Sequence, residues 1–308
     1  MTSPEAQAGV ADVDLTGRTV LVTGGTDGIG REAALAFARL GATVGVTGRD
    51  QSKGVRVRDR LRDAGPGDAA LFTADFASQA AVRDLASEVR DRFDRLDVLV
   101  NNAGGIFREP SLTEDGVERT FAVNYLAHYR LTHDLLGLLR AAPDGHVVNV
   151  SSNGHRFADA DFHPRDLEDY GAFDAYNRSK LALVLFTASL ARRAPDLRAN
   201  ALHPGFVADS NFYRRFPWPF QRLLVLLQYV PRALIRRPVV DEAGGAAAIC
   251  YVAVSPETRA STGEYFEERS AIAPSEAARD RDAQERLWAL SADLAGLGPD
   301  DFAPPGGR

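Results

Sequence analysis

Short apolar runs alternate with longer amphipathic segments along most of the chain. The stretch "TVLVTGG" (19–25) is a continuous apolar run, which is typical of a parallel strand buried on both faces. "REAALAFARLG" (31–41) follows with the apolar spacing of a helix and ends at a glycine, and "ATVGVTG" (42–48) is again strand-like. This alternation predicts strand–helix–strand units, which build parallel sheets.

The same alternation continues through the next 150 residues. A strand followed by a turn is predicted at "LDVLVNNAG" (96–104), "HVVNVSS" (146–152) and "RANALHPG" (198–205), and helices are predicted near 51–64, 78–93, 115–140 and 174–193. We therefore expect an α/β fold with a doubly wound parallel sheet. The stretch "PSEAARDRDAQERLWALSADLAGLG" predicts a last helix, with Ser275 as N-cap and Gly296 or Gly298 at its end.

The chain shows neither a proline- or serine-rich linker nor an internal repeat, so we predict a single domain over 15–298. Residues 1–14 are predicted to be a disordered lead-in, and 299–308 a flexible tail. The alternation fails over 206–240, where prolines, a tryptophan and many arginines gather. This segment predicts an insertion at one edge of the sheet, with a substrate lid near 206–238.

Composition and charge argue against several classes of protein. With 308 residues, 45% hydrophobic and 25% charged, the chain is typical of a soluble globular protein, and its net charge of −6 offers no basic surface for nucleic acid. No signal peptide is predicted, and the longest apolar run at the later positions, "LLVLLQYV", is far shorter than the ~20 residues of a membrane span. The only cysteine, Cys250, is expected to be a buried, inert thiol. We expect a cytoplasmic protein, and the histidine spacing predicts no metal site.

A glycine-rich segment, "TGGTDGIG" (23–30), joins the first strand to the first helix. Gly24, Gly28 and Gly30 allow a backbone to approach a pyrophosphate, which then faces the free N–H groups of the helix. The alternative is a turn that needs glycine only for tight packing. The position of the segment in the alternating pattern favours a dinucleotide site, for which the other candidate residues here are Thr26, Asp27 and Ile29.

The end of the second strand bears on the choice of cofactor. An acidic residue there would bind the adenosine ribose hydroxyls, but "VTGRD" places Arg49 at this point. Arginine can accept a 2′-phosphate, so NADP is predicted in preference to NAD. Two observations weigh against this: an arginine is often merely solvated, and the carboxylate of Asp27 would repel the phosphate.

The stretch "AYNRSK" (175–180) contains one of only two lysines among 36 basic residues. Tyr176 and Lys180 are four residues apart on a predicted helix and share a face. An ammonium group there would favour the phenolate and lower the tyrosine pKa, which makes Tyr176 a candidate acid/base. The alternative is an ordinary exposed pair. Upstream, "NVSS" (149–152) ends a strand where ligands bind in such folds, and a serine hydroxyl there can donate to a carbonyl oxygen.

Together these motifs resemble those of the short-chain dehydrogenase/reductase family. Its pattern is matched in order and spacing by "TGGTDGIG", "NNAG" (101–104), "NVSS", "YNRSK" and "HPG" (203–205), over roughly residues 15–270. The segments "VNYLAHYRLTHDLL" and "RLWALSADLAGL" look most like the retinol-dehydrogenase-like and WW-domain-oxidoreductase-like branch. The resemblance implies a Rossmann fold and an NAD(P)-dependent oxidoreductase.

The resemblance also implies roles for individual residues. Tyr176 would be the general acid/base, Lys180 its pKa-lowering partner and a ribose ligand, and Ser152 the residue that polarises the carbonyl. Asn124 would hold a proton-relay water. The further cofactor contacts implied are Asp75 and Phe76 beside the adenine, Asn101, Ala103 and Gly104 along the adenosine, and Pro204, Gly205 and Val207 against the nicotinamide.

One position departs from the family. A threonine or serine that grips the cofactor often stands two residues after the valine, whereas this chain has Asp209 there, followed by Ser210. We assign no contact to either.

We therefore expect hydride transfer between a nicotinamide and a carbonyl or alcohol carbon of a small molecule. The alternatives are a catalytically silent cofactor-sensing or scaffold protein on the same fold, and a nucleotide-sugar epimerase or dehydratase, which the glycine spacing disfavours. The aromatic residues of 206–238 predict a lipophilic substrate, or packing of the lid onto the domain, and the arginines among them are compatible with peripheral membrane contact.

The helix predicted over 175–193 is apolar nearly all round, so one side must meet the sheet. The other side is expected either to form a homodimer, as is common in the family, or to be covered by the C-terminal elements.

Overall fold

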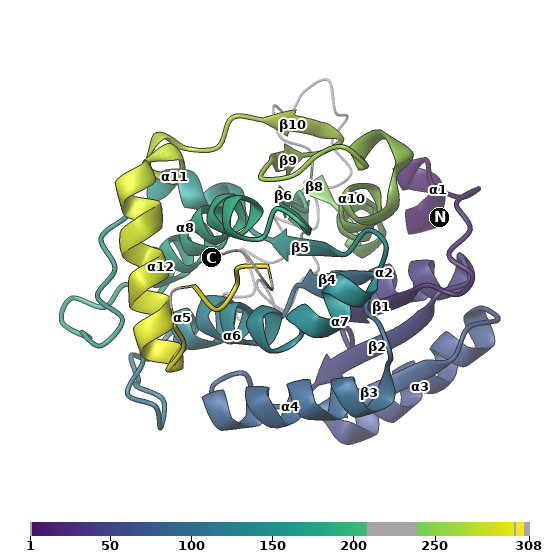
Figure 1. Cartoon of the computed structure of the whole chain (residues 1–308), viewed down its shortest axis with the longest axis horizontal. Coiled ribbons are helices and arrows are strands. Elements are labelled where there is room, and N and C mark those ends of the chain that lie inside the picture. The colour runs from purple at the N-terminus through teal and green to yellow at the C-terminus, as the bar shows by residue number, and fades with distance from the viewer. Residues whose placement is uncertain (1, 208–238, 299, 305–308) are drawn as a thin grey trace, which may run out of the picture.

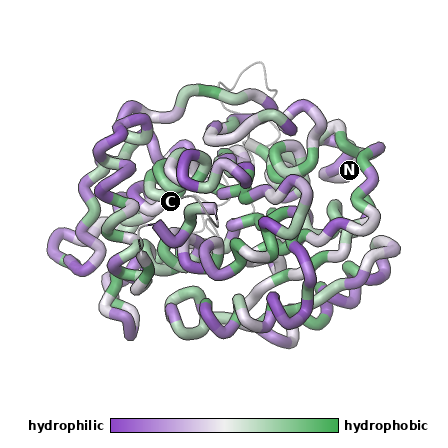
Figure 2. The backbone as a smooth tube through the Cα atoms, in the orientation of Figure 1, coloured by the Kyte–Doolittle hydropathy of each residue, from purple (hydrophilic) through white to green (hydrophobic). Residues whose placement is uncertain are grey.

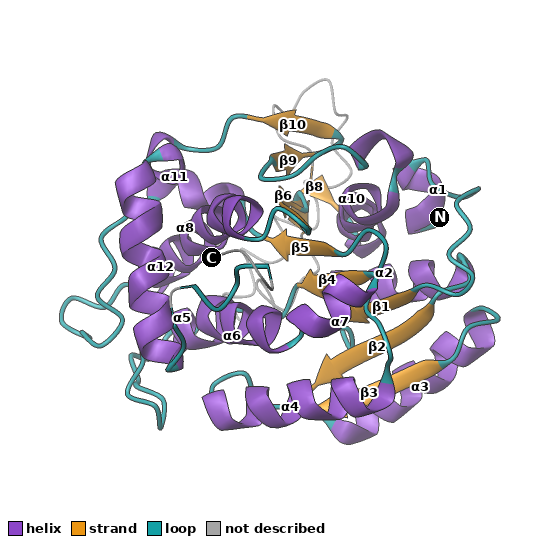
Figure 3. Cartoon of the chain, viewed as in Figure 1, coloured by secondary structure: helices purple, strands orange, loops and turns teal. Residues whose placement is uncertain are grey.

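An eight-stranded sheet forms the centre of the protein (Figures 1 and 3). The computed structural model describes residues 2–207, 239–298 and 300–304. The strand order is β10-β9-β6-β5-β4-β1-β2-β3, and all neighbours pair in parallel except β10 with β9. The strands are β1 (Thr19–Val22), β2 (Thr43–Gly48), β3 (Ala69–Thr73), β4 (Val98–Asn101), β5 (His146–Val150), β6 (Arg198–His203), β9 (Tyr265–Glu267) and β10 (Ser270–Ile272). The order 3-2-1-4-5-6 is that of a Rossmann fold, as the sequence predicts.

Helices cover both faces of the sheet, each over its own apolar core. On one face lie α1 (Pro4–Ala8), α2 (Gly28–Arg39), α3 (Gln51–Ala64) and α10 (Glu242–Val254). On the other lie α4 (Gln79–Arg92), α6 (Ala127–Asp134) and α8 (Ala172–Arg193), with α12 (Arg281–Ala295) packed outside α8. Figure 2 shows hydrophilic residues along the outer loops and alternating hydropathy along the outer helices. Strands buried on both sides explain the apolar runs in the sequence.

Shorter elements complete the described chain. They are α5 (Arg119–Phe121), the π-helical turn η1 (Ala122–Leu126), α7 (Leu136–Ala141), the 3₁₀ turns η2 (Asn153–Phe157) and η4 (Pro256–Thr258), α11 (Glu276–Arg279), and the strands β7 (Phe206–Val207) and β8 (Val239–Val240), which pair with each other. The predicted substrate lid lies outside the described residues beyond position 207. Of the helices in the described ranges, none has the length and apolar character needed to cross a membrane.

The N-terminal segment is ordered in the structure, which differs from the predicted disordered lead-in over 1–14. Helix α1 packs on α10 and α2, and Ala8 and Val10 are buried. The carboxylate of Glu5 accepts two hydrogen bonds from the Arg39 guanidinium, at 2.6 and 2.8 Å. A few small apolar side chains and one bidentate ion pair are enough to fix a segment that lacks a recognisable apolar period.

The C-terminal tail is also anchored over its described part, residues 300–304. Phe302 is fully buried, with its ring 4.7 Å from that of Trp288 and 5.0 Å from that of Tyr129. Its backbone carbonyl accepts a hydrogen bond from Arg140. The described part of the predicted flexible tail (299–308) thus packs on the domain, because one aromatic side chain enters a space between helices.

The outer side of α8 is covered by the same chain. Helices α12 and α11 pack on it, and the ring of Trp288 of α12 lies 6.0 Å from that of Phe186 at an interplanar angle of 28°. Of the two expectations for this surface, coverage by the C-terminal elements is the one seen, and the homodimer stays a prediction. The predicted last helix is divided at Asp280, while its caps agree with the sequence: Ser275 caps α11 and Gly296 ends α12 at φ 63°.

Candidate active site

The loops that follow β1, β4, β5 and β6 lie at one edge of the sheet (Figure 1) and carry many of the candidate residues. This is the carboxyl edge of the parallel strands, at the point where the strand order reverses between β1 and β4. Ligands of open α/β sheets bind at such a point. The loops after β1 and β6 meet there, although β1 ends at Val22 and β6 ends at His203. The other candidate residues follow β2 and β3 or lie on η1 and α8.

Three glycines of the first loop, Gly24, Gly28 and Gly30, are glycine for two different reasons. A Cβ atom on Gly24 would lie 3.0 Å from Cα of Ala103, and one on Gly30 would lie 2.4 Å from Nδ2 of Asn102. These two glycines are needed for close packing against the turn after β4. Gly28, at φ 52° and the start of α2, would place a Cβ in open space. The loop therefore leaves the N-terminus of α2 accessible to a phosphate group.

Two residues that the sequence analysis did not select hold this loop in place. The Thr23 hydroxyl accepts hydrogen bonds from the backbone N–H of Asn102 (2.8 Å) and of Ala103 (3.0 Å). The Asn102 amide group donates to the Thr23 carbonyl at 2.8 Å. The glycine loop and the "NNAG" turn are thus one hydrogen-bonded unit. Thr23 belongs to the "TGGTDGIG" motif and Asn102 to the "NNAG" motif. Membership of these motifs is the only feature of the sequence that points to them.

The second lysine of the chain lies beside the glycine loop. Lys53 Nζ is 2.5 Å from the Asp27 carboxylate, which also accepts from the N–H of Gly28 at 2.9 Å and lies 3.9 Å from Arg31. This pairing offsets the negative charge that would repel a phosphate. Arg49 is exposed at the end of β2 and has no hydrogen bond or ion pair with any described residue. Its guanidinium is thus available for a ligand. Thr26 is buried against Gly48, where an added Cβ would lie 2.5 Å from its hydroxyl oxygen.

Some predicted cofactor residues point into the core. The Asn101 side chain is buried and donates to Thr132 (3.1 Å) and to Asn149 (2.9 Å). Phe76 is buried with its ring 5.4 Å from that of His128. Neither side chain is placed to line a cofactor, so only their backbones can do so. Asp75 is exposed and caps the N–H of Ala77.

Tyr176 and Lys180 lie one turn apart on α8, as the sequence predicts. The ammonium nitrogen of Lys180 is 5.6 Å from the centroid of the Tyr176 ring and donates to the Val150 carbonyl at 2.9 Å. Burial lowers the pKa of Lys180 to about 8. Desolvation raises the pKa of Tyr176 to about 12, against a lowering by its hydrogen bond with the Ser152 side chain. Desolvation is the largest effect on the pKa of Tyr176, so this side chain is protonated at neutral pH.

Ser152 follows β5 and begins η2. Its extended backbone (φ −160°, ψ 155°) and a hydrogen bond from the N–H of Gly154 to its oxygen (3.1 Å) orient the side chain. The preceding Ser151 is buried and donates to the Lys180 carbonyl at 2.7 Å. The structure therefore brings Ser152, Tyr176 and Lys180 together, and Ser151 ties the strand to the helix that carries the other two.

Asn124 is fully buried in the π-helical turn η1, a deformation that is frequent at functional sites. Its amide donates to the Gly105 carbonyl (2.9 Å) and to the Ser179 hydroxyl (3.0 Å), and its oxygen accepts from the N–H of Gly105 (2.9 Å). A Cβ on Gly104 would come within 2.9 Å of that oxygen and 3.6 Å of the Lys180 nitrogen. Asn124 thus lies beside Lys180 and fixes the turn after β4.

The segment after β6 reaches the glycine loop. A Cβ on Gly245 of α10 would meet Ile29 at 2.7 Å, Val207 at 2.9 Å and the carbonyl of Pro204 at 3.5 Å. Gly205 has φ 90°, which favours glycine. Ile29, Pro204 and Val207 therefore converge on one point. Asp209 and Ser210 lie outside the described residues.

These residues fit a dinucleotide. An open helix N-terminus can bind the pyrophosphate, a free arginine lies where the adenosine ribose would be, and a buried ammonium and a phenol stand at the other end. Chemically, the hydroxyl groups of Ser152 and Tyr176 can both donate to one substrate oxygen atom, and the phenol can exchange a proton with it.

Comparison with known proteins agrees with this geometry. A sequence profile described as "short chain dehydrogenase" matches residues 18–217. Retinol dehydrogenase 14 of Homo sapiens is 37% identical over 301 residues, which span 91% of this chain and 87% of that protein. Polyprenol dehydrogenase of Mus musculus is 37% identical over 297 residues, spanning 92% and 86%.

A similar solved structure is the Pseudomonas aeruginosa RhlG/NADP active-site complex. It has a TM-score of 0.62 and 25% sequence identity, and the match covers 82% of this chain and 95% of that one.

Proposed function

The chain belongs to the short-chain dehydrogenase family, whose members are oxidoreductases that act on CH–OH and C=O groups, and we propose that Tyr176 is its general acid/base. The observation that carries this proposal is the placement of the Tyr176 ring over the buried ammonium of Lys180, one helical turn apart on α8, with Ser152 at the end of the neighbouring strand β5. A scaffold protein without chemistry would have no need of a buried cation at this place, since burial of a charge is costly.

The proposed roles follow from the geometry. A bound nicotinamide supplies the hydride in reduction and accepts it in oxidation. Tyr176 donates a proton to the carbonyl oxygen in reduction, and its raised pKa keeps it protonated at neutral pH. The Ser152 hydroxyl donates a second hydrogen bond to that oxygen and stabilises its developing charge. Lys180 stabilises the phenolate that remains, and Asn124 keeps the neighbouring turn in place.

We propose NADP as the preferred cofactor. The support is Arg49, exposed and without a described partner at the end of β2, together with the pairing of Asp27 with Lys53. A 2′-phosphate would give Arg49 a bidentate partner. The structurally similar RhlG is named as a complex with NADP, which is compatible with this proposal.

We further propose a lipophilic substrate. Exposed large hydrophobic side chains of the described residues lie on segments around the catalytic groups: Phe157 ends η2, Phe173 precedes Tyr176 on α8, Phe206 follows Gly205, and Leu112 lies in the loop after β4. Their exposed fractions are 73%, 50%, 36% and 46%. An apolar rim suits an apolar substrate. Relatives named for retinol and polyprenol agree with this class.

Steady-state assays of the purified protein test the proposal. NADPH and NADH are each offered with hexanal, nonanal, all-trans-retinal and cyclohexanone, and absorbance at the nicotinamide band is followed. We expect turnover with NADPH and the highest kcat/KM for the long or bulky aldehydes. Tight cofactor binding without turnover of any compound would favour the cofactor-sensing or scaffold alternative. Membrane contact of 206–238 and a cytoplasmic location stay predictions.

A further inference from the structure

The segment that follows the catalytic serine is held by the C-terminal part of the domain. Asn153 and His155 lie one and three residues after Ser152, and both side chains are buried. Their partners come from β9 and from the residues before α11, more than 100 positions later in the sequence. We call Asn153, His155, Tyr265, Glu267 and Ser275 the serine clasp.

His155 connects the two sides of the clasp through both ring nitrogens. Its Nδ1 lies 2.7 Å from the Ser152 carbonyl oxygen, which also accepts from the N–H of His155 at 3.1 Å. Its Nε2 lies 3.1 Å from the backbone nitrogen of Ser275. Because a backbone N–H can only donate, Nε2 must accept, and Nδ1 must carry the proton that it donates to Ser152. The tautomer is therefore fixed by the structure.

The electrostatic environment agrees with a neutral ring. Burial lowers the pKa of His155, the neighbouring Arg156 lowers it further, and a hydrogen bond to Ser152 and the charge of Glu267 act in the opposite direction. A neutral imidazole supplies one donor and one acceptor, as the two contacts require. The Tyr265 ring packs on the imidazole at 4.6 Å and limits its rotation.

Asn153 supplies a second tether. Its amide donates to the Glu267 carboxylate at 2.5 Å, and its oxygen accepts from the Tyr265 hydroxyl at 3.1 Å. On the opposite side, Gly154 packs against α8, where a Cβ would lie 2.4 Å from the side-chain oxygen of Asn177, the neighbour of Tyr176. The loop of Ser152 is thus pressed between α8 and the C-terminal segment.

We propose that His155 is a positioning residue, which sets the orientation of Ser152 by holding its backbone carbonyl, and that the C-terminal segment controls the catalytic serine through this imidazole. The inference rests on the proposed function, since it assumes that Ser152 donates to the reacting oxygen. An error of ~1 Å in the position of a reacting group can cost about 100-fold in rate. A residue that touches neither substrate nor cofactor can therefore have a large effect on kcat.

A double-mutant cycle tests the inference, with kcat for NADPH-dependent reduction of the best aldehyde of the panel as the readout. We expect His155→Leu to lower kcat by roughly 10- to 100-fold and to leave the Kd for NADPH unchanged. Ser152→Ala should lower kcat by about 10²–10³-fold. If His155 acts through Ser152, the double variant should be no slower than Ser152→Ala alone.

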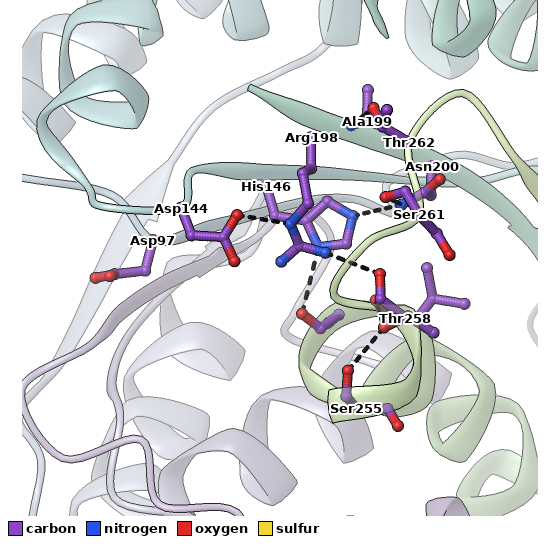
Figure 4. Close-up of polar contacts among 12 residues, drawn as sticks. Asp97, Asp144, His146, Arg198, Ala199, Asn200, Ser255, Thr258, Ser261 and Thr262 are labelled. Atoms are coloured by element: carbon purple, nitrogen blue, oxygen red, sulfur yellow. Dashed lines mark hydrogen bonds and ion pairs between the residues drawn. The ribbon is translucent and has the colours of Figure 1, made fainter. Parts of the chain in front are cut away.

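His146 provides a matched control. It is also a fully buried neutral histidine, and it lies at the opposite, amino-terminal edge of the sheet at the start of β5, in the network around Asn200 and Arg198 that Figure 4 shows. Its Nε2 faces the Asn200 amide at 3.1 Å and its Nδ1 the Ala253 carbonyl at 3.3 Å. His146→Leu should lower stability but leave kcat unchanged. Equal effects of the two substitutions on kcat would reduce His155 to a structural residue.

Two conservative variants separate the contacts of His155 and remain informative if His155→Leu does not fold. Asparagine places an N–H near the position of Nδ1 and can still donate to Ser152, whereas glutamine places an oxygen near Nε2 and can still accept from Ser275. We expect His155→Asn to retain more of kcat than His155→Gln. The reverse order, or losses that multiply in the double-mutant cycle, would overturn the inference. Full activity of Ser152→Ala would instead refute the proposed role of Ser152.

Discussion

Lys180 shows how burial and chemistry combine at a single residue. The side chain is 5% exposed, and its ammonium lies between the Val150 carbonyl, the Tyr176 ring and the turn that Asn124 fixes. Arginine could not be accommodated as easily, because its guanidinium is larger and planar. The other lysine, Lys53, pairs with the glycine loop. Both lysines of this arginine-rich chain thus lie beside the predicted cofactor site.

The pKa of Lys180 predicts a pH dependence. With a pKa of about 8 the amine is protonated below pH 8 and loses its charge above it, whereas Tyr176, at about 12, keeps its proton throughout this range. The phenolate formed on proton donation is therefore stabilised only below about pH 8. We expect kcat/KM for carbonyl reduction to be level between pH 6 and 8 and to fall at higher pH. A rise above pH 8 would contradict this assignment.

Arg49 carries the prediction on cofactor choice. Arg49→Ala should weaken NADPH binding by roughly 10- to 100-fold, because the 2′-phosphate loses a charged hydrogen-bond partner, and should spare NADH. Titration of cofactor fluorescence measures both. Arg60→Ala is the control, since Arg60 is also exposed but lies farther along α3. Tighter binding of NADH than of NADPH by the unmodified protein would refute the preference and point to Asp27 as the dominant charge.

At the scale of the elements, the sequence predicts helices and strands most accurately where a hydrophobic pattern extends over many residues. The strands at 19–25 and 146–152 and the helix that carries Tyr176 agree with the structure, because each has an apolar run or period. The strand at 198–205 also agrees, although Asn200 interrupts its apolar residues. The short strands β3, β9 and β10 were not predicted, since three to five residues, several of them alanine, give little signal. Helix α10 is apolar on all sides and has no period to detect.

The sequence also predicted the candidate active site only in part. Ser152, Tyr176 and Lys180 meet as their motifs imply, whereas Asn101 and Phe76 turn into the core. A motif gives the position of a residue in the loop but not the direction of its side chain, which neighbouring helices decide. The side chains of Thr23, Asn102 and His155 form hydrogen bonds with backbone groups of other residues. Contacts of this kind cannot be recognised from the sequence alone, because every residue has the same backbone groups.

The anchoring of the C-terminal tail gives a prediction at this scale. Phe302→Ala should lower the free energy of unfolding by about 3–5 kcal/mol, since the ring is fully buried among Tyr129, Phe186 and Trp288. Urea unfolding followed by tryptophan fluorescence measures the loss. The matched control is Phe157→Ala, which removes a ring that is 73% exposed and should change stability by less than about 0.5 kcal/mol. Equal losses would show that the tail is not anchored.

For the whole molecule, the buried histidines predict sensitivity to acid. Burial lowers the pKa values of His128 and His146 to about 3, from 6.5. Between these values the unfolded chain binds protons that the native protein does not, so stability is complete above about pH 6.5 and is lost as the pH falls toward 3. Each histidine contributes a slope of about 1.4 kcal/mol per pH unit.

Urea unfolding at several pH values between 4 and 7 measures this dependence. The variant His146→Gln removes one of the two groups, so its slope should be smaller by about 1.4 kcal/mol per pH unit. An unchanged slope would show that carboxylates alone cause the acid sensitivity.

The most direct test of the account is turnover by Tyr176→Phe. The substitution removes one oxygen atom and keeps the ring that lies beside Lys180. We expect NADPH to bind with nearly unchanged Kd, while kcat for the best aldehyde of the panel falls by about 10²–10⁴-fold, which is the usual contribution of a general acid. Near-normal turnover by this variant would contradict the assignment of Tyr176 as the acid/base of the reaction.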